Sequence, residues 1–221
     1  MKTTNKIALY LLLTISLLSF LFFLVLVTIR VKGLVFLDND ILTTVANSRT
    51  RFFDYVFVII SYLGETKTII VLCLILLLLP NRKKFGIPVT VAVVVSGLIN
   101  YAIKYLVLRA RPENLFLLDN TLNYQMPTSP SFPSGHSQTA LVFYFSSFYL
   151  LLKNKSFFDS KTKRIILSII VVEFSLLMCF ARIYLGVHFL SDVLAGLCLM
   201  IAIMSLFVLI NQSLHFDTEY L

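Results

Sequence analysis

Three short polar patches, far apart in the sequence, hold the residue types that can handle a phosphate group. They are Lys104–Pro112 (KYLVLRARP), Pro133–His136 (PSGH) and Arg182–Asp192 (RIYLGVHFLSD). Together they supply several cations, two histidines, a carboxylate and a serine–glycine turn. Each patch lies at the edge of a long apolar run, where polar groups of a membrane protein generally have a functional use.

The third patch pairs a histidine with a carboxylate. His188 and Asp192 are four residues apart, so in a helix they lie on one face. The carboxylate can then accept the Nδ1 hydrogen of the imidazole, which leaves Nε2 free to act as a nucleophile or a base. Arg182 lies upstream across a turn that contains Gly186, and glycine permits tight turns. A structural His–Asp pair that caps the last span would show the same spacing.

The second patch, Pro133–His136, stands just before an apolar helix. The first backbone N–H groups of a helix point outward with the positive end of its dipole, so this turn can bind an anion. Ser134 adds a hydroxyl donor, and His136 is placed in the first turn, where it can protonate a leaving oxygen. An ordinary N-cap turn with a surface histidine is the alternative.

The first patch holds cations. Lys104 and Arg111 can clamp one phosphate, with the arginine providing a bidentate fork. Cations that snorkel to a membrane interface would give the same pattern, and we interpret Arg109 in this way. Each patch thus has a structural explanation, but three separate explanations do not predict complementary roles. Phosphoryl transfer needs a nucleophile with an orienting group, a general acid and cations that hold the phosphate. The three patches supply this complete set, with Lys104, Arg111 and Arg182 as the cations.

The elements that must position these patches are membrane spans. The 221 residues are 58% hydrophobic and 14% charged, with a mean hydropathy of +0.90, and one span needs about 20 apolar residues. The sequence predicts an all-α, six-span transmembrane helical bundle that forms a single domain over residues 1–221, with its motif region at 104–196. The predicted spans are Ile7–Ile29, Phe53–Leu79, Phe85–Val107, Ser134–Leu152, Ile165–Tyr184 and Phe189–Ile210. The second is interrupted by the polar stretch Ser61–Lys67.

The basic residues predict the orientation of the bundle. With the N-terminus inside, ten of the nineteen Lys and Arg residues fall on the inner side, and four of the nine outer ones belong to the patches. All three patches then lie on the outer face, so we expect a multi-pass protein of the cell membrane with an extracytoplasmic site. The net charge of +8 fits this rule, and no basic face of a soluble fold indicates binding to nucleic acid.

Three further features lie outside the patches. Leu37–Asn47 is mildly amphipathic, which predicts a helix along the membrane surface. The long loop Glu113–Phe132 is a candidate lid or substrate-entry loop. Glu173 lies near the middle of the fifth span, where a carboxylate is a functional candidate. No carboxylate cluster for Mg²⁺ lies near the patches, so we expect neither a metal nor another cofactor.

The three patches resemble the tripartite signature of the type 2 phosphatidic acid phosphatase superfamily, which includes bacterial lipid phosphatases and vanadium haloperoxidases. In order, the matching residues are Lys104, six residues, Arg111-Pro112, Pro133-Ser134-Gly135-His136, Arg182, five residues, His188, three residues and Asp192. The sequence departs from the family pattern at Ala181, where a serine usually precedes the arginine. The loss of this hydroxyl predicts weaker phosphate binding but not lost activity.

The resemblance implies a role for each matching residue. His188 would attack phosphorus to form a phosphohistidine, and Asp192 would orient it. His136 would protonate the leaving alcohol, or the leaving phosphate of a diphosphate. The phosphoryl oxygens would be held by Lys104, Arg111, Arg182, Ser134 and the N–H group of Gly135. Water would then release phosphate, and no metal would be needed.

We therefore expect an integral membrane phosphatase for lipid phosphates or diphosphates, with the acyl or prenyl chain of the substrate left in the bilayer. Candidate substrates are undecaprenyl diphosphate, phosphatidylglycerophosphate and phosphatidic acid, because the motifs recognise the phosphate and not the tail. A lipid phosphotransferase, in which an alcohol replaces water, remains open, as does the oligomeric state. A small-anion transporter is disfavoured, because its polar residues would lie near the bilayer midplane.

Overall fold

The computed structural model describes residues 3–113, 124, 127–153 and 160–213. Every regular element in these residues is a helix, which confirms the predicted all-α fold. The α-helices are α1 (Thr3–Thr28), α2 (Lys32–Asn47), α3 (Arg51–Leu63), α4 (Thr66–Leu78), α5 (Gly86–Val107), α6 (Leu141–Lys153), α7 (Lys161–Tyr184) and α8 (Leu190–Ser213). The short π-helix η3 (His136–Ala140) leads directly into α6.

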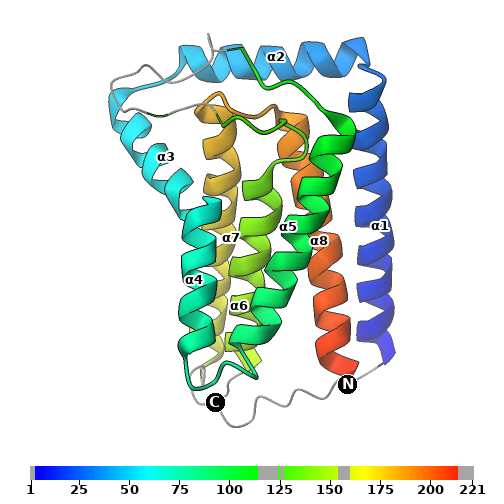
Figure 1. Cartoon of the computed structure of the whole chain (residues 1–221), viewed down its shortest axis with the longest axis vertical. Coiled ribbons are helices and arrows are strands. Elements are labelled where there is room, and N and C mark those ends of the chain that lie inside the picture. Colours follow the sequence, from blue (N-terminus) through cyan, green and yellow to red (C-terminus); the bar gives the residue numbers. More distant parts are fainter. Residues whose placement is uncertain (1–2, 114–123, 125–126, 154–159, 214–221) are drawn as a thin grey trace.

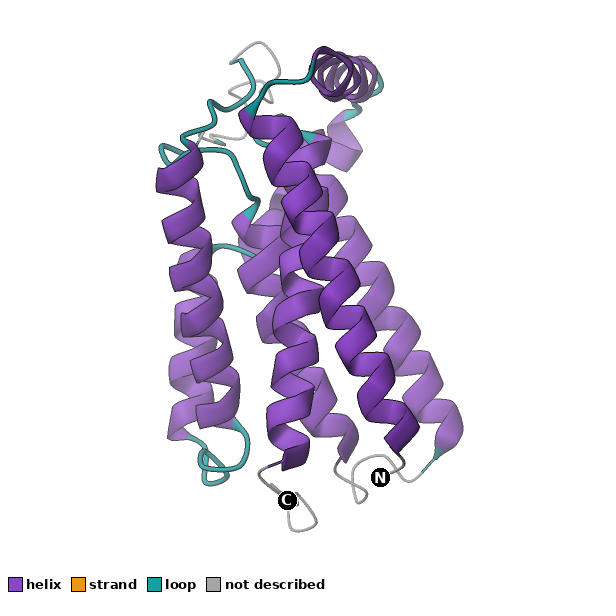
Figure 2. Cartoon of the chain, turned by 90° about the vertical axis from the view of Figure 1, so that its right-hand side faces the viewer, coloured by secondary structure: helices purple, strands orange, loops and turns teal. Residues whose placement is uncertain are grey.

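The long helices run side by side as one bundle, and α2 lies across one end of it (Figure 1). Figure 2 shows the same arrangement from the side, with α2 seen end-on above the bundle. The predicted amphipathic helix Leu37–Asn47 is therefore confirmed as part of α2. Its two buried residues, Asp38 and Leu42, are four apart and so face the bundle together.

Among the described residues, four helices are long and apolar enough to cross a membrane: Lys6–Thr28, Gly86–Val107, Lys161–Tyr184 and Leu190–Ser213. A fifth crossing is obtained when α3 and α4, which meet at an angle of 47°, are taken as one broken span. The remaining predicted span, the fourth (Ser134–Leu152), corresponds to η3 and the 13-residue α6, and α6 is shorter than the other spanning helices. The six-span count therefore stays a prediction.

The predicted interruption of the second span is confirmed at the junction of α3 and α4. Helix α3 ends at Leu63, and the backbone N–H of Gly64 donates to the carbonyl of Ser61 in a tight last turn. Helix α4 starts at Thr66 after Glu65, whose backbone is extended. The hydroxyl of Thr68 donates to the carbonyl of Tyr62 across the break, at 2.7 Å.

Apolar side chains cover the outside of the helices, whereas polar side chains are buried near one end of the bundle. Leu18, Ile70 and Ile169 are each more than half exposed, an outer surface that suits lipid rather than water. Glu173 is also exposed, on α7, so its carboxylate does not belong to the buried polar cluster.

Helix α8 lies close to the turn that precedes η3. A Cβ atom at Gly196 would lie 2.8 Å from the carbonyl oxygen of Ser134 and 3.0 Å from Cβ of Ser137. Only glycine permits this approach, because a larger residue would push the turn away from α8. The close contact places the second patch next to the start of α8, where the third patch ends.

Candidate active site

The three polar patches meet at the end of the bundle that carries α2. The backbone N–H of Ser134, in the second patch, donates to the carbonyl of Asp192 in the third at 3.0 Å. Arg111, in the first patch, donates to the carbonyl of Val187 at 2.7 Å and to Nε2 of His188 at 3.2 Å. Direct hydrogen bonds thus join all three patches into one site.

His188 lies in the turn between α7 and α8 and faces Asp192 in the first turn of α8. The turn depends on Gly186, whose φ of 69° is in the left-handed region that favours glycine. The backbone N–H groups of Val187 and His188 both donate to the carbonyl of Arg182 at 3.2 Å. Nδ1 of His188 lies 3.4 Å from Oδ2 of Asp192, so the structure brings the predicted pair together.

Ser131 is a member of this cluster that the sequence did not single out. Its hydroxyl donates to Oδ2 of Asp192 at 2.5 Å and lies 3.3 Å from Nδ1 of His188. The backbone N–H of Phe189 donates to the same carboxylate oxygen at 3.0 Å. These contacts hold the carboxylate toward Nδ1, while Arg111 donates to Nε2, so the imidazole carries its proton on Nδ1.

Arg109 is largely enclosed between two carboxylates and is not an interfacial cation. Its guanidinium lies 2.6 Å from Asp192 and 2.7 Å from Asp38 of α2, with only 13% of the side chain exposed. It also stacks on the ring of Phe189, with Cζ 4.2 Å from the ring centroid. The interpretation of Arg109 as a snorkelling side chain is therefore wrong, because burial and two ion pairs fix it inside the site.

Asp38 is the second residue that sequence reasoning missed. Its carboxylate accepts hydrogen bonds from the backbone N–H of Ser191 at 3.0 Å and from the Ser191 hydroxyl at 2.6 Å. It also receives Arg109, and it is almost fully buried. The only sequence signal was its place on an amphipathic helix, so nothing in the sequence tied it to residues in the third patch.

The three predicted phosphate clamps are each fixed by hydrogen bonds to oxygen atoms. Lys104 donates to the carbonyls of Pro130 at 2.5 Å and Ser131 at 3.2 Å. Arg111 donates through Nε to the carbonyl of Ser129 at 2.7 Å. Cations held in this way are preorganised, so they lose little freedom when an anion binds.

Arg182 is buried at the end of α7 and contacts the break between α3 and α4. Its guanidinium donates to the hydroxyl of Ser61 and to the hydroxyl of Tyr124, the latter at 2.7 Å. Ser61 and Tyr124 also bond to each other at 3.1 Å. Ala181, the departure from the family pattern, is fully buried and packs in the apolar cluster that contains Tyr124.

The turn of the second patch is held by a buried amide pair. Asn100 of α5 donates to the carbonyl of Pro133 at 3.3 Å and to Oε1 of Gln138 at 2.8 Å. Gly135 faces this amide, since a Cβ atom there would lie 3.5 Å from Oδ1 of Asn100. His136 opens η3, as expected for the first turn of the helix, and its Nε2 donates to the carbonyl of Ser61 at 3.0 Å.

Burial and the neighbouring cations control the charge of two groups in the loops. Burial, followed by Arg111 and Lys104, holds the pKa of His188 well below its usual range. The imidazole is therefore neutral at neutral pH, as a nucleophile must be. Burial and the charge of Arg182 lower the pKa of Arg111 to about 10, so this clamp keeps its positive charge.

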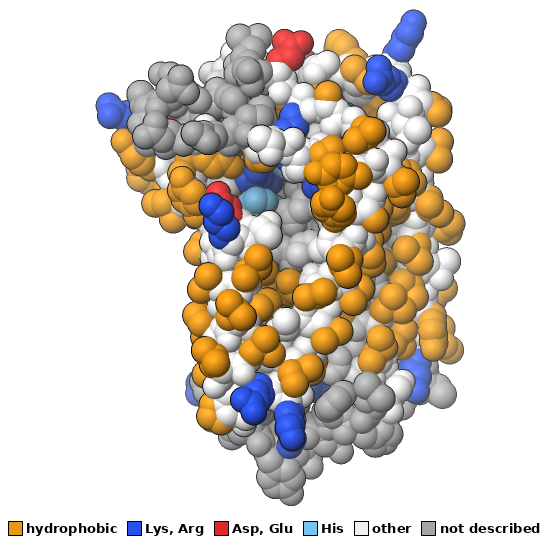
Figure 3. Space-filling view, in the orientation of Figure 1, with side chains coloured by type: hydrophobic (Ala, Val, Ile, Leu, Met, Phe, Trp, Pro, Cys, Tyr) orange, Lys and Arg blue, Asp and Glu red, His pale blue; other side chains and the backbone are white. Residues whose placement is uncertain are grey.

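A groove of about 420 Å³ leads from the site along the outside of the bundle between α4 and α5. Its lining includes the site residues Lys104, Gly135 and His136. Its sides are mostly apolar and include Ile70 and Val94. Figure 3 shows this face, on which a hollow between apolar side chains exposes a histidine and basic groups.

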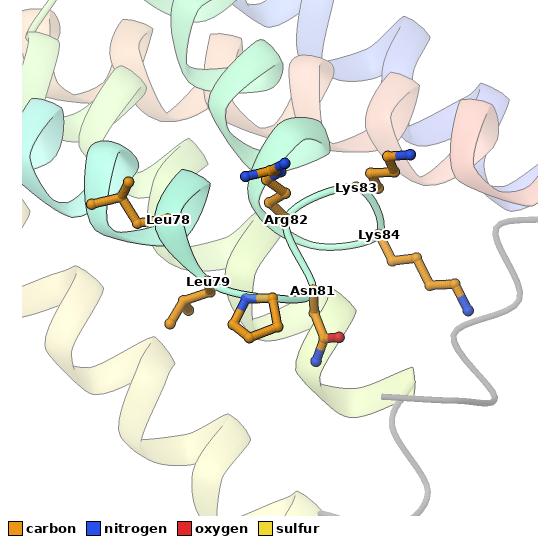
Figure 4. A pocket seen from close by; sticks show the side chains of 7 residues that line it. Leu78, Leu79, Asn81, Arg82, Lys83 and Lys84 are labelled. Atoms are coloured by element: carbon orange, nitrogen blue, oxygen red, sulfur yellow. The ribbon is translucent and has the colours of Figure 1, made fainter.

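The opposite end of the bundle carries a second pocket of different character. It is formed by the loop between α4 and α5 and is lined by Leu78, Leu79, Pro80, Asn81, Arg82, Lys83 and Lys84 (Figure 4). This lining contains no histidine or carboxylate, so it lacks the groups for the chemistry of the first site. The predicted lid Glu113–Phe132 lies largely outside the described residues, which omit 114–123 and 125–126.

Three curated proteins resemble this chain in sequence. Phosphatidylglycerophosphatase B of Bacillus subtilis is 30% identical over 184 residues, which cover 81% of this chain and 86% of that protein. The undecaprenyl-diphosphatase of Sulfolobus acidocaldarius is 29% identical and covers 63% of this chain, with 61% of its own length matched. Lipid phosphate phosphatase gamma of Arabidopsis thaliana is 31% identical and covers 54% of this chain, with 50% of its own length matched. All three relatives are named as phosphatases.

Two solved structures share the fold. A transmembrane PAP2-type phosphatidylglycerolphosphate phosphatase from Bacillus subtilis has a TM-score of 0.75 at 24% identity, covering 89% of this chain and 96% of that one. LpxE from Aquifex aeolicus has a TM-score of 0.53 at 22% identity, covering 77% and 94%. The model of the PAP2 superfamily matches residues 85–215, which contain all three polar patches. The chain is therefore a multi-pass membrane protein that belongs to the PAP2 superfamily.

Proposed function

We propose that this chain is an integral membrane phosphatase that hydrolyses lipid phosphates or diphosphates at the outer face of the membrane, through a phosphohistidine on His188. The observation that carries the proposal is the line formed by Asp192, His188 and Arg111 beside two further buried cations. In this proposal residues 1–221 form one membrane-embedded domain of six spans. Helices α3 and α4 together make one crossing, and η3 and α6 together make another.

The first chemical step transfers the phosphoryl group to the imidazole. The lone pair on Nε2 of His188 attacks phosphorus, the bond from phosphorus to the leaving oxygen breaks, and His136 gives its proton to that oxygen. Asp192 stabilises the Nδ1 proton as positive charge develops on the ring. Arg111 turns from Nε2 to a phosphoryl oxygen when the substrate binds.

The second step returns the histidine to its starting state. Water attacks the phosphohistidine, His136 now accepts a proton from that water, and the bond from phosphorus to Nε2 breaks to release phosphate. Lys104, Arg111, Arg182, Ser134 and the N–H of Gly135 hold the phosphoryl oxygens throughout. The cations among these groups stabilise the negative charge on the equatorial oxygens of the transition state, as Mg²⁺ does in other phosphoryl-transfer enzymes. Turnover should therefore survive excess EDTA.

The groove between α4 and α5 supports a lipid as the substrate. Its apolar sides face outward from the bundle, and its polar end reaches Lys104 and His136. A lipid that enters sideways would leave its chain against apolar residues such as Ile70 while its phosphate meets the cations. The proposal extends to the same classes of substrate as the named relatives: phosphatidylglycerophosphate, undecaprenyl diphosphate and other lipid phosphates, phosphatidic acid among them.

The test is phosphate release from the purified protein in detergent, measured across a panel of lipid monophosphates and diphosphates. His188→Ala should abolish release and also abolish acid-labile labelling of the protein by a ³²P-labelled substrate. Asn81→Ala, at an exposed position in the loop between α4 and α5, is the control that should leave both unchanged. If His188→Ala retains most of the wild-type turnover, the covalent mechanism is wrong. Addition of an alcohol acceptor to the same assay separates hydrolysis from phosphotransfer.

A further inference from the structure

We propose that the break between α3 and α4, residues 61–64, is a positioning element for catalysis: Ser61 fixes the phosphate clamp Arg182, and Gly64 keeps open the space in which His136 acts as general acid. This inference rests on the proposed function. It concerns a segment outside the three motifs and outside the matched family region, residues 85–215.

Ser61 contacts two site residues with two different groups. Its side-chain hydroxyl accepts a hydrogen bond from Arg182 and lies 3.1 Å from the hydroxyl of Tyr124. Its backbone carbonyl accepts a hydrogen bond from Nε2 of His136 at 3.0 Å. Ser61 is fully buried, so water does not compete for these bonds.

The end of α3 makes this carbonyl available. In a continuous helix, the carbonyl of Ser61 would accept its hydrogen bond from the N–H of Glu65. Here Glu65 donates to Tyr62 at 3.3 Å instead, and Gly64 donates to Ser61 at 3.0 Å. Carbonyls in the last turn of a helix can accept a further partner, and His136 takes that place. With Nε2 bound to the carbonyl, Nδ1 is the atom left to carry a proton to the leaving oxygen.

Gly64 is required for space rather than for its backbone conformation. Its φ of −97° is accessible to any residue. A Cβ atom, however, would lie 2.4 Å from Cδ2 of His136 and 2.9 Å from the sulfur of Met178. The methionine is flexible and can move, but the imidazole is tied to Ser61, so a side chain at residue 64 would displace the ring.

The contact of Ser61 with Arg182 and the contact of Gly64 with His136 affect different parts of the reaction. Arg182 stabilises the phosphoryl oxygens whatever the leaving group is. His136 matters most when the leaving oxygen is a strongly basic alkoxide, as with phosphatidic acid, and little when it is p-nitrophenolate. Loss of the Ser61 contact should therefore change the relative turnover of the two substrates differently from loss of the space at Gly64.

The experiment compares Ser61→Ala and Gly64→Ala on phosphatidic acid in detergent micelles and on p-nitrophenyl phosphate. Ser61→Ala should slow both substrates about tenfold and weaken vanadate inhibition by a similar factor, as expected for one hydrogen bond to a charged group. Gly64→Ala should slow phosphatidic acid on the order of 10²-fold, while p-nitrophenyl phosphate turnover and vanadate inhibition stay near wild type. Matched controls are Ser205→Ala, whose hydroxyl donates to the carbonyl of Ile201 within α8, and Gly33→Ala, where an added Cβ would meet no atom of the described residues within 4 Å.

Two further variants cover the case in which a primary variant does not fold. Tyr124→Phe removes a second hydroxyl from Arg182 and should also weaken vanadate inhibition. The double variant Gly64→Ala with His136→Ala removes the ring that the new methyl group meets, so it should fold where Gly64→Ala does not. If folding is not restored, the assigned contact is wrong.

The outcomes separate this inference from the proposed function. Equal loss on both substrates in Gly64→Ala, or wild-type behaviour of both Ser61→Ala and Gly64→Ala, would overturn the positioning role while leaving the phosphatase assignment in place. A wild-type protein that releases phosphate from neither substrate would overturn the proposed function, and the inference with it.

Discussion

The guanidinium of Arg109 donates a 2.6 Å hydrogen bond to Asp192, the carboxylate that faces the proposed nucleophile. The same guanidinium binds Asp38 at 2.7 Å, so one cation is shared by two buried carboxylates from different helices. This pairing links α2 to the start of α8 and gives the buried carboxylate of Asp192 a charged partner.

Arg109→Met should destabilise the protein strongly, because it leaves Asp38 and Asp192 buried without their shared cation. Removing one partner of a buried ion pair costs about 3–5 kcal/mol, so the free energy of unfolding should fall by an amount of that order. Thermal unfolding in detergent measures the effect, with Arg51→Met on an exposed position of α3 as the matched control. An unchanged melting temperature would show that the ion pairs contribute nothing to stability.

The pKa of His188 predicts an acid-resistant first step. Burial and adjacent cations hold this pKa well below 6.5, and the unprotonated imidazole is the nucleophile. Formation of the phosphohistidine should therefore continue as the pH falls through 6.5 and be lost only at lower pH. Single-turnover labelling as a function of pH measures it. Loss of labelling with a midpoint at the ordinary histidine pKa would contradict the structure.

The lowered pKa of His188 also predicts that the stability of the fold depends on pH. In the unfolded chain His188 gains a proton as the pH drops below 6.5, whereas in the folded chain it stays neutral. The free energy of unfolding should therefore fall as the pH decreases below that value, until the folded-state pKa is reached. Comparison of the melting temperature of wild type and His188→Gln from neutral to acid pH isolates this contribution, because the glutamine variant lacks it.

Vanadate should inhibit more tightly than phosphate, because it adopts the five-coordinate geometry of the transition state. Arg182→Ala should weaken the vanadate inhibition constant and turnover together, on the order of 10²-fold. Inhibition assays on wild type, Arg182→Ala and the control Arg51→Ala decide the matter. A variant with an unchanged inhibition constant would show that Arg182 is not a phosphate clamp.

The orientation of the bundle can be tested with single cysteines in a protein from which Cys73, Cys179 and Cys198 have been removed. Asn47 is exposed on α2, at the end that carries the site, and Asn81 is exposed in the loop at the other end. In intact cells Asn47→Cys should react with a membrane-impermeant maleimide, and Asn81→Cys should react only after the membrane is opened. The reverse pattern would place the site on the inner face.

The sequence singled out residues that the structure brings together where their types are rare in apolar surroundings. Histidines and cations at span ends are conspicuous, and the structure brings His188, Asp192, Arg111 and Ser134 into direct contact. The interruption at Ser61–Lys67 was also visible, because polar residues and a glycine together end an apolar run.

The partners of those residues could not be predicted, because their contacts join distant parts of the chain. Asp38 meets Ser191 across 153 residues, and Ser61 meets Arg182 across 121. Ser131 is one of several serines in its loop, and only the fold selects it for Asp192. Arg109 has the sequence context of a snorkelling cation, and its low exposure and its two ion pairs distinguish the two roles.

The contacts of Asp38 and Ser61 set the minimum length of a working protein. The family match begins at residue 85, so a fragment cut there would carry every motif. Such a fragment would lack the carboxylate that receives Arg109 and the groups that receive Arg182 and His136. The smallest unit with a complete site must therefore contain the supporting partners as well as the motifs, and this unit starts no later than α2.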